Sequence, residues 1–375
     1  MVVGYVSIHV LTRDDHKPPY IAIRAKQTIA AENVFHMAWS PDGRSLVTAM
    51  GGGGEYSIWD VTSGKKIRSL DEPYGPWVAH GPFVFTPDGH HVLVTPKGVL
   101  TADDGKRVIF ALWNVETGNV DRQILQPAED YLTAHDFALA PSAHRLAVAY
   151  GGTSTSKRVV VVYDTRTWRI INTKVPLLAP YGGGFAISPD GNRIAMGGGD
   201  GKIYRGQARG TIWIYDIAAG QLLRTIEGAH ADRIRELAFD PTGTMLASAA
   251  PVGARQRNEE TDLLDTFRED DPIRLWSVET GDKLAFLTGS FRSSYTLSFN
   301  NSRPLLISGD LNGVKGDSFF YRLWDTRSGQ LLATSENFSR TAPVAVAFSP
   351  DGGRIALSIN FNRVLILDLG NFGLN

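Results

Sequence analysis

The sequence contains no cysteine among its 375 residues. Disulfide bonds, thiol nucleophiles and thiolate metal sites are therefore excluded, although a cysteine-free chain fits a reducing or an oxidising compartment equally well. The chain also lacks any run of 18 apolar residues, and its start, Met1-Val2-Val3-Gly4-Tyr5, has no basic segment of the kind that opens a secretory signal. We expect a soluble, unexported protein of the cytoplasm.

Neither sign of charge is in excess, because 38 Lys and Arg residues stand against 39 Asp and Glu residues, for a formal net charge of −1. This balance gives no electrostatic reason to expect binding to nucleic acid or to a membrane. No nucleophile elbow or zincin helix is present, and the glycine run at 51–54 lacks the Lys-Ser or Lys-Thr of a phosphate-binding loop. We predict no cofactor and no catalytic residues.

What the chain does contain is one pattern repeated seven times: a tight turn, followed about 20 to 35 residues later by an aromatic or apolar residue and usually an acid. The turns begin at Ser40, Thr86, Ala140, Ser188, Asp240, Asn300 and Ser349. Their partners are Trp59-Asp60, Trp113-Asn114, Tyr163-Asp164, Tyr215-Asp216, Trp276-Ser277, Trp324-Asp325 and Leu367-Asp368. A spacing of 46 to 60 residues from turn to turn indicates a repeat architecture.

Each repeat predicts four antiparallel strands. Alternating apolar residues flank turns such as Ser40-Pro41-Asp42-Gly43, which is typical of a β-hairpin. A third strand carries the aromatic residue and the acid, and a second turn, such as Thr62-Ser63-Gly64, leads into a fourth strand. Such units, closed into a ring, spread burial over many contacts between units, so a chain of this length is predicted to form a single domain.

These motifs resemble the WD-repeat family over roughly residues 20 to 369, most clearly in Ile58-Trp59-Asp60-Val61 and Leu323-Trp324-Asp325-Thr326. The resemblance implies an all-β fold, a seven-bladed β-propeller of four-stranded antiparallel blades. We expect residues 1–19 to form an N-terminal extension and residues 20–375 to form the propeller. The expected blades are 32–70, 80–125, 134–175, 182–226, 233–287, 294–334, and 342–369 with 20–29.

The chain departs from the family's polar network, in which a His, a Ser or Thr, an Asp and the Trp are hydrogen-bonded. Blade five alone offers a near match, with His230, Ser248, Asp270 or Asp271, and Trp276. The chain therefore looks like a degenerate, bacterial-type member of the family. We expect its blades to depend on apolar packing more than on the polar network.

The last repeat lacks a fourth strand, because only seven residues follow Asp368. Residues 20–29 resemble the other fourth strands and directly precede blade one. We therefore expect residues 20–29 to complete blade seven and to close the ring by β-pairing. Residues 1–12 also alternate like a strand, but the repeat does not require them.

Hairpin parity predicts that one face of the disc carries nearly all of the variation in loop length. The long segments are 95–107, 151–158, 197–210, 250–272 and 309–318. Because binding sites are often built on variable loops of a rigid scaffold, we predict a non-catalytic interaction scaffold, monomeric by itself, that binds a protein or peptide there. The predicted contact residues are Tyr74, Trp77, Tyr131, Tyr181, Arg205, Arg209, Leu263, Leu264, Phe267, Phe291, Arg292, Phe338 and Arg340. Alternatively, some of these rings cover the blade core, and the basic loop around Arg205 pairs with the acidic insertion at 250–272.

A second hypothesis concerns the mouth of the central channel. His36, Asp136 and Glu236 stand four residues before the first residue of the opening turn in blades one, three and five, from where they could converge. Oxygen-rich metal sites of this kind occur in propeller hydrolases and lactonases. The alternative function is therefore a metal-dependent hydrolase or a small-ligand binder at the channel mouth.

Overall fold

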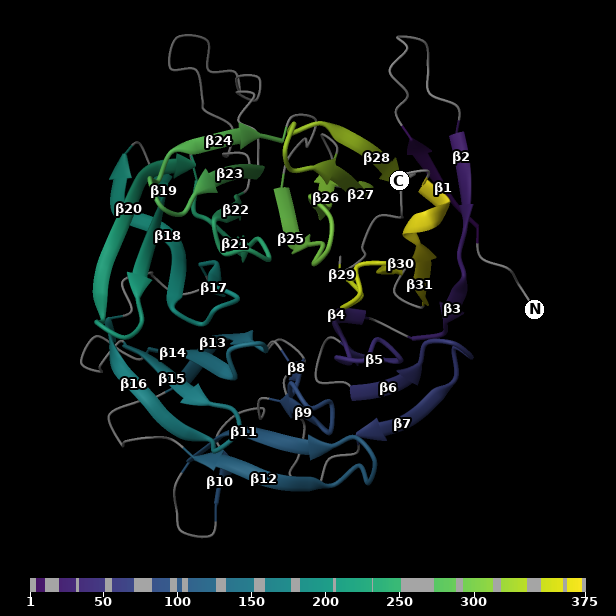
Figure 1. Cartoon of the computed structure of the whole chain (residues 1–375), viewed down its shortest axis with the longest axis horizontal. Helices are drawn as coiled ribbons and strands as arrows, with labels where there is room; N and C mark the ends of the chain where they lie inside the picture. The colour runs from purple at the N-terminus through teal and green to yellow at the C-terminus, as the bar shows by residue number, and fades with distance from the viewer. Residues whose placement is uncertain are drawn as a thin grey trace.

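The computed structural model describes residues 5–10, 20–31, 34–50, 56–70, 83–94, 100–102, 107–125, 133–151, 159–176, 183–204, 207–230, 232–250, 273–287, 293–312, 318–335, 345–359 and 363–372. The described strands form seven antiparallel sheets, which stand as blades around a central space (Figure 1). The predicted seven-bladed β-propeller is therefore confirmed.

The first four blades follow one another along the chain. Blade one contains β4 (Val34–Trp39), β5 (Ser45–Met50), β6 (Tyr56–Asp60) and β7 (Lys66–Leu70). Blade two contains β8 (Val84–Phe85), β9 (His91–Val94), β10 (Leu100–Thr101), β11 (Arg107–Asn114) and β12 (Val120–Leu125). Blade three contains β13 (Thr133–Ala140), β14 (Arg145–Gly151), β15 (Val159–Asp164) and β16 (Arg169–Pro176). Blade four contains β17 (Phe185–Ile187), β18 (Arg193–Tyr204), β19 (Gln207–Asp216) and β20 (Gln221–His230).

Blades six and seven also take up strands from the start of the chain. Blade five contains β21 (Glu236–Phe239), β22 (Met245–Ala249), β23 (Ile273–Ser277) and β24 (Lys283–Phe286). Blade six contains β25 (Ser293–Phe299), β26 (Leu305–Asn312), β27 (Ser318–Asp325) and β28 (Leu331–Ser335), with β1 (Tyr5–Val10) and β2 (Tyr20–Arg24) outside them. Blade seven contains β29 (Val346–Phe348), β30 (Arg354–Ile359), β31 (Arg363–Asp368) and β3 (Gln27–Ile29). A short 3-10 helix, η1 (Leu369–Phe372), follows β31.

The hairpin that opens blade one shows why the first turn recurs. Gly43 has a φ of 67°, a left-handed conformation that suits a residue without Cβ. Its N–H donates to the carbonyl of Ser40 at 2.8 Å, and the N–H of Ser40 donates to the carbonyl of Ser45 at 2.9 Å. Pro41 presets the φ that this turn needs. The turn thus sets the register in which β4 and β5 pair.

The core is a ring of interfaces between blades. The described buried apolar residues fall into seven clusters, and each cluster joins two neighbouring blades. The cluster between blades seven and one, for example, brings Ile29, Val364 and Ile366 against Leu46 and Trp59. Because every blade packs on both sides, a chain of 375 residues is stabilised without one large central core.

The ring closes through β3, as the sequence predicted, but with fewer residues. Gln27, Thr28 and Ile29 pair with Ile366, Leu365 and Val364 of β31. Residues 20–24 were expected in the same strand, and this part of the expectation is wrong. The chain leaves blade seven at Ala25 and Lys26, and β2 pairs instead with β1, which in turn pairs with β28 of blade six. β1 accounts for the difference, because it forms a hairpin with β2 and so pairs with the backbone N–H and C=O groups of β2.

Three predicted loops continue as strands. In blade four, β18 and β19 pair out to Tyr204 and Gln207, so most of segment 197–210 is a β-hairpin. In blade two, β10 pairs with β11 within the predicted loop 95–107. In blade six, β26 and β27 pair out to Asn312 and Ser318. Glycines and polar residues made these segments look like loops, but pairing within each hairpin satisfies their backbone groups.

Candidate functional site

The acids of the two recurrent turns bond to the turns themselves. Ser40 Oγ donates to Asp42 Oδ1 at 2.6 Å and the Arg44 N–H donates to it at 3.0 Å, so the pKa of Asp42 is lowered, mainly by the bond from Ser40. In the second turn, the N–H and Oγ of Ser63 donate to Asp60 Oδ1 at 2.7 and 2.6 Å. Equivalent bonds from backbone N–H groups reach Asp164, Asp216, Asp325 and Asp368. These carboxylates therefore stabilise the conformation of the turns.

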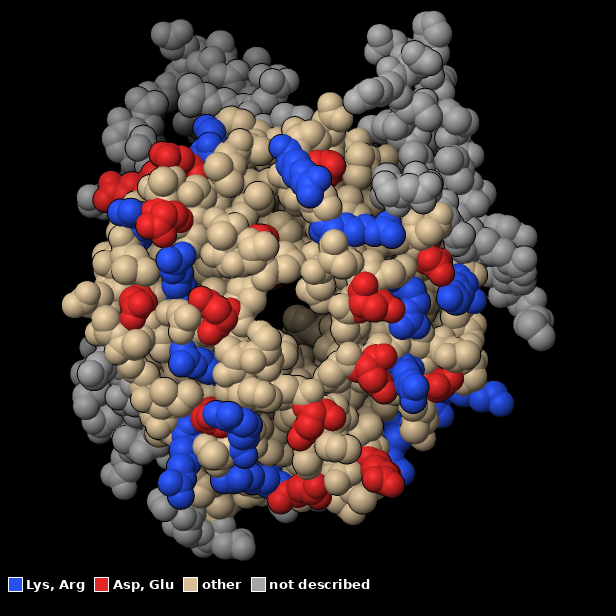
Figure 2. All heavy atoms as spheres, viewed as in Figure 1, with Lys and Arg blue, Asp and Glu red and all other residues tan. Residues whose placement is uncertain are grey.

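Side chains from one blade also bond to turn carbonyls of the next blade. Arg68 of blade one donates to the carbonyls of Glu116 and Thr117 at 2.7 and 3.1 Å. Arg224 of blade four donates to the carbonyl of Glu279 at 2.8 Å, and Arg354 of blade seven donates to that of Gly43 at 2.8 Å. The face that carries these short turns is therefore joined from blade to blade. Figure 2 shows Lys, Arg, Asp and Glu side chains interspersed around the central opening on the face toward the viewer.

A hydroxyl on the second strand holds the Trp side chain in three blades. Trp59 Nε1 donates to Thr48 Oγ1 at 2.9 Å, Trp276 Nε1 to Ser248 Oγ at 2.8 Å, and Trp324 Nε1 to Ser308 Oγ at 3.0 Å. All three hydroxyl residues are buried. More of the polar network is thus present than the single near match in blade five suggested.

His230 extends this network in blade five. Its Nε2 lies 2.7 Å from Ser248 Oγ, and the side chain is 3% exposed. Burial, with a smaller effect of the Arg274 charge, lowers the pKa of His230 to about 3, so the imidazole is neutral at physiological pH. A neutral ring bonded to a core hydroxyl is suited to a structural role. Asp270 and Asp271, the predicted acids of this network, lie outside the described residues.

Two carboxyl groups interact at the central channel. Asp136 lies in β13 of blade three, directly after a shift in the register between β13 and β14, and Glu236 is the first residue of β21 in blade five. Both strands lie near the centre of the ring (Figure 1). Burial raises the pKa of Asp136 to about 7. Burial, and then the charge of Asp136, raise the pKa of Glu236 to about 8. Gly184 of blade four lies against Glu236, and a Cβ there would lie 2.8 Å from the Glu236 backbone.

His36, the third predicted member of the channel site, stacks edge-on against Phe83, with ring centroids 6.4 Å apart. Within the part of the chain that the structure describes, no group of three or more His, Asp or Glu side chains is arranged to hold a metal ion. Among the described residues, therefore, the charge of Asp136 acts on Glu236, and His36 is not arranged with them as a third ligand. Carboxyl groups with raised pKa values hold their protons to higher pH than exposed carboxyl groups do.

Comparisons with known proteins agree with this geometry. The family "WD domain, G-beta repeat" matches residues 25–60 and 220–251. WD repeat-containing protein VIP3 of Arabidopsis thaliana is 30% identical over 191 residues, which are 46% of this chain and 54% of that protein. Eukaryotic translation initiation factor 3 subunit I of Schizosaccharomyces pombe is 30% identical over 105 residues, 28% of this chain and 30% of that protein. Two segments of the chain therefore match WD repeats, and the chain resembles WD-repeat proteins.

The chain spans about half the length of VIP3 and under a third of the initiation factor subunit in these matches. A solved structure extends the likeness to the whole ring. A chain in the structure titled "Crystal Structure of Mitotic Checkpoint Complex" aligns with a TM-score of 0.65 at 15% identity, covering 96% of this chain and 98% of that one. At such low identity the likeness shows the propeller fold alone.

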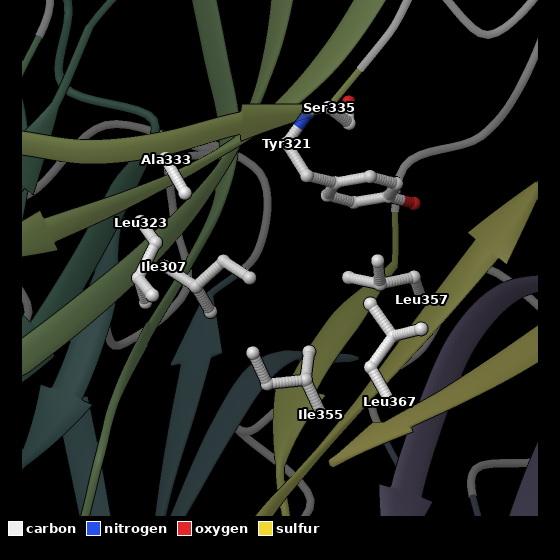
Figure 3. Close-up of a pocket in the computed structure, with 8 residues that line it drawn as sticks. All are labelled: Ile307, Tyr321, Leu323, Ala333, Ser335, Ile355, Leu357 and Leu367. Atoms are coloured by element: carbon white, nitrogen blue, oxygen red, sulfur yellow. Dashed lines mark hydrogen bonds between the residues drawn. The ribbon is translucent and has the colours of Figure 1, made fainter. Parts of the chain in front are cut away.

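One cavity lies between blades six and seven of the ring (Figure 3). Its volume is about 20 Å³, enough for a water molecule but not for a ligand. Side chains from β26, β27 and β28 face those from β30 and β31 across it. The lining residues are Ile307, Tyr321, Leu323, Ala333, Ser335, Ile355, Leu357 and Leu367. We interpret it as a packing gap at a blade interface.

The predicted partner-binding residues fall outside what the structure describes. Tyr74, Trp77, Tyr131, Tyr181, Arg205, Leu263, Leu264, Phe267, Phe291, Arg292, Phe338 and Arg340 lie in undescribed segments, and only the backbone of Arg209, within β19, is described. They stay predictions. In the described residues, no helix is long and apolar enough to cross a membrane.

The sequence pattern did not lead us to predict that Thr48 and Ser308 bond to tryptophans, although their spacing from the opening turn could have indicated it. Both residues, like Ser248, stand eight positions after the first residue of the opening turn, in blades whose third strand carries Trp. Blade two also carries a Trp, Trp113, but has Val94 at that position. The arginine contacts to neighbouring turns gave no comparable signal, because they join residues far apart in the sequence: 48 positions for Arg68 and Glu116, 55 for Arg224 and Glu279, and 311 for Arg354 and Gly43.

Proposed function

We propose that this protein is a non-catalytic interaction scaffold that presents its loop-bearing face to a protein or peptide partner. One observation carries the proposal: the two faces of the disc differ. On one face, short turns are joined from blade to blade by bonds such as those of Arg68, Arg224 and Arg354. The longer connections, such as the one from the end of β22 to the start of β23, join the opposite ends of the same strands. A rigid ring that carries variable loops on one face is suited to recognition.

The residue types in those connections support the proposal. Aromatic and Arg side chains are enriched among residues that dominate protein interfaces, and Trp77, Phe291 with Arg292, and Phe338 with Arg340 occupy the blade-to-blade segments. The initiation factor relative is by its name a subunit of a larger factor. We include a cytoplasmic location and a monomeric free state in this proposal.

Affinity capture from the native host tests the loop face. We expect the wild-type chain to retain partners that are lost when Trp77→Ala is combined with deletion of residues 255–269. Arg44→Ala is the matched control, because Arg44 lies in a turn of the opposite face and its side chain is 85% exposed. If the loop-face variant retains every partner at wild-type yield, the loop-face proposal is wrong.

The channel carries a second candidate function, binding of a small cationic ligand or a metal ion by Asp136 and Glu236. The electrostatic coupling of these two carboxyl groups supports it. Titration calorimetry with Ca²⁺, Mn²⁺ and a small organic amine at pH 8 tests it, with Asp136→Asn combined with Glu236→Gln as the control. Absence of saturable heat from the wild-type chain would exclude binding of these probes.

A further inference from the structure

At three junctions between blades, the fourth strand of one blade carries an arginine four residues after a glycine of its second turn. The arginines are Arg68 in β7, Arg122 in β12 and Arg224 in β20, and the glycines are Gly64, Gly118 and Gly220. Arg68 and Arg224 donate to carbonyls in the second turn of the next blade. The repeat predicts the same contact for Arg122, with residues 164–169 of blade three.

A glycine in the next turn makes room for such an arginine. A Cβ on Gly118 of blade two would lie 2.7 Å from Cδ of Arg68. In blade three the corresponding residue is Trp168, whose N–H donates to the Asp164 carbonyl at 2.7 Å, as that of Gly118 donates to the Asn114 carbonyl at 2.9 Å. Both residues have a left-handed φ, of 57° and 77°. Since the turns correspond, the Trp168 side chain begins where Arg68 lies at the preceding junction.

Arg122 is exposed as a consequence. Within the described part of the chain, its guanidinium forms no hydrogen bond or ion pair, unlike those of Arg68 and Arg224. Arg169, which follows Trp168, is also exposed and has no such bond from its side chain among the described residues. Two arginines of one junction are therefore available to a partner.

A third arginine, Arg166, lies in the same turn and is 66% exposed. Its guanidinium pairs with Asp164 at 2.7 Å, and that carboxylate is 18% exposed. Asp121, the acid next to Arg122, accepts a hydrogen bond from Asn114 within its own blade. Figure 2 shows blue side chains gathered at the lower left, over the junction of β12 with β15 and β16. Asp164 thus offsets the charge of Arg166, whereas the other two arginines have no acid paired with them among the described residues.

The chemistry of this junction fits an acidic segment of a protein. Guanidinium groups bind carboxylates through two parallel hydrogen bonds. Trp and Arg are also enriched among the residues that dominate protein interfaces, and Ile170, 43% exposed, adds apolar area beside them. A nucleic acid needs a longer basic track, but the same face exposes acids such as Asp42 and Glu279, whose side chains are 60% and 78% exposed.

We propose that Arg122, Arg166, Trp168 and Arg169, here called the arginine surface, bind a short acidic segment of a protein partner. Carboxylates of the segment pair with Arg122 and Arg169, and an apolar side chain of the segment packs against the exposed edge of Trp168. The arginine surface lies on the face of the short turns. It is therefore separate from the proposed loop face, and either proposal can fail without the other.

The test uses a fluorescein-labelled peptide, Glu-Asp-Glu-Leu-Asp-Glu, and its uncharged counterpart, Gln-Asn-Gln-Leu-Asn-Gln. Fluorescence anisotropy with the full chain measures binding, at about 50 mM salt so that screening of the charges is limited. We expect saturable binding of the acidic peptide alone. Arg122→Gln combined with Arg169→Gln should weaken this binding roughly ten-fold or more, through loss of two charged pairs.

The matched control is Arg44→Gln combined with Arg327→Gln, which removes two exposed arginines from the same face in blades one and six. This variant should bind within roughly two-fold of the wild type, because its charges lie too far away to act strongly. Equal weakening by the two pairs of substitutions would overturn the proposal, since it would reveal an effect of net charge alone. Absence of saturable binding to the wild type would also overturn it, as would tighter binding of an oligothymidine that Arg122→Gln with Arg169→Gln abolishes.

A fluorophore gives a second readout that leaves the arginines intact. The chain has no cysteine, so Thr167→Cys supplies a single labelling site next to Trp168. Ser328→Cys is its counterpart in blade six, where the turn reads Asp-Thr-Arg-Ser-Gly instead of Asp-Thr-Arg-Thr-Trp. Both residues are exposed, and each hydroxyl accepts one backbone N–H at 3.3 Å. The acidic peptide should change the emission of the label at position 167 and not at position 328, and an equal response at both would overturn the proposal.

Discussion

At the residue scale, single hydroxyl groups decide how the repeat's tryptophans are held. Thr48 Oγ1 is buried and accepts the indole N–H of Trp59 at 2.9 Å. Thr48 and Trp59 lie on neighbouring strands, so this bond ties β5 to β6 through side chains as well as backbone. Apolar packing surrounds the pair, and the polar contact fixes the orientation of the ring within it.

Thr48→Val tests this contact, because it keeps the shape of the side chain and removes the acceptor. We expect a loss of about 1–3 kcal/mol in the free energy of unfolding, since the indole N–H is left buried without its acceptor. Thr48→Ser is the control, because it keeps the oxygen and loses a methyl group, which costs about 1 kcal/mol. Chemical denaturation measures both. If Thr48→Val is as stable as the wild type, the hydroxyl makes no net contribution to stability.

At the scale of elements, each turn between the first two strands must fit its own backbone and the neighbouring blade. Gly352 has a φ of 69°, and a Cβ there would collide with Asn300 and Ser302 of blade six. Gly228 lies in β20 and not in such a turn; it also has a left-handed φ of 62°, but a Cβ there would meet no atom within 4 Å. Replacing each glycine by alanine therefore distinguishes two destabilising effects. At Gly228 only the backbone conformation is unfavourable, whereas at Gly352 the new Cβ also collides with the neighbouring blade.

Gly228→Ala should therefore destabilise the protein by about 1–2 kcal/mol, the usual penalty for a left-handed residue with a side chain. Gly352→Ala should cost more, because Asn300, which donates to the Gly352 carbonyl at 2.8 Å, must also move. Thermal unfolding of the two variants measures the difference. A lower melting temperature for Gly228→Ala than for Gly352→Ala would contradict this account of the turn.

The N-terminal strands make a second test at this scale. β3 buries Ile29 completely between blades seven and one, whereas β1 and β2 add to the outside of blade six. A chain starting at residue 25 should melt within about 2 °C of the full chain, and a chain starting at residue 31 should melt lower by roughly 5 °C or more, because it loses the closing strand. Equal melting of the two truncated chains would refute closure through β3.

At the scale of the whole molecule, the ring brings together groups that no single blade contains. Asp136 comes from blade three and Glu236 from blade five, and the charge of Asp136 raises the pKa of Glu236. Their pKa values of about 7 and about 8 exceed the usual values of 3.8 and 4.5 for such groups. Folding therefore favours their protonated forms, and the unfolded chain releases these protons at lower pH than the folded chain.

This difference gives a sign for the pH dependence. The contribution of the pair to stability falls as pH rises from about 4, where the unfolded chain ionises, to about 8, where the folded chain does. Asp136→Asn combined with Glu236→Gln should therefore melt higher than the wild type at pH 8 by roughly 2 °C or more, with little difference near pH 4. Melting curves between pH 4 and 9 measure the gap. His230 is present in both proteins, so its own titration cancels. A gap that does not widen with pH would show that the pair is not coupled to folding.

The sequence by itself determined the propeller, its seven blades and its closure by the start of the chain, because turns and alternating strands are local and recur at a readable interval. It also located Trp276, Ser248 and His230 within one blade. Only the tertiary structure decided that residues 20–24 pair with β1 and not with β31, since both partners suit an alternating strand. The same holds for the arginine contacts between blades and for the effect of the Asp136 charge on Glu236. These contacts join residues far apart in sequence, and the curvature of the closed ring alone sets the distances between them.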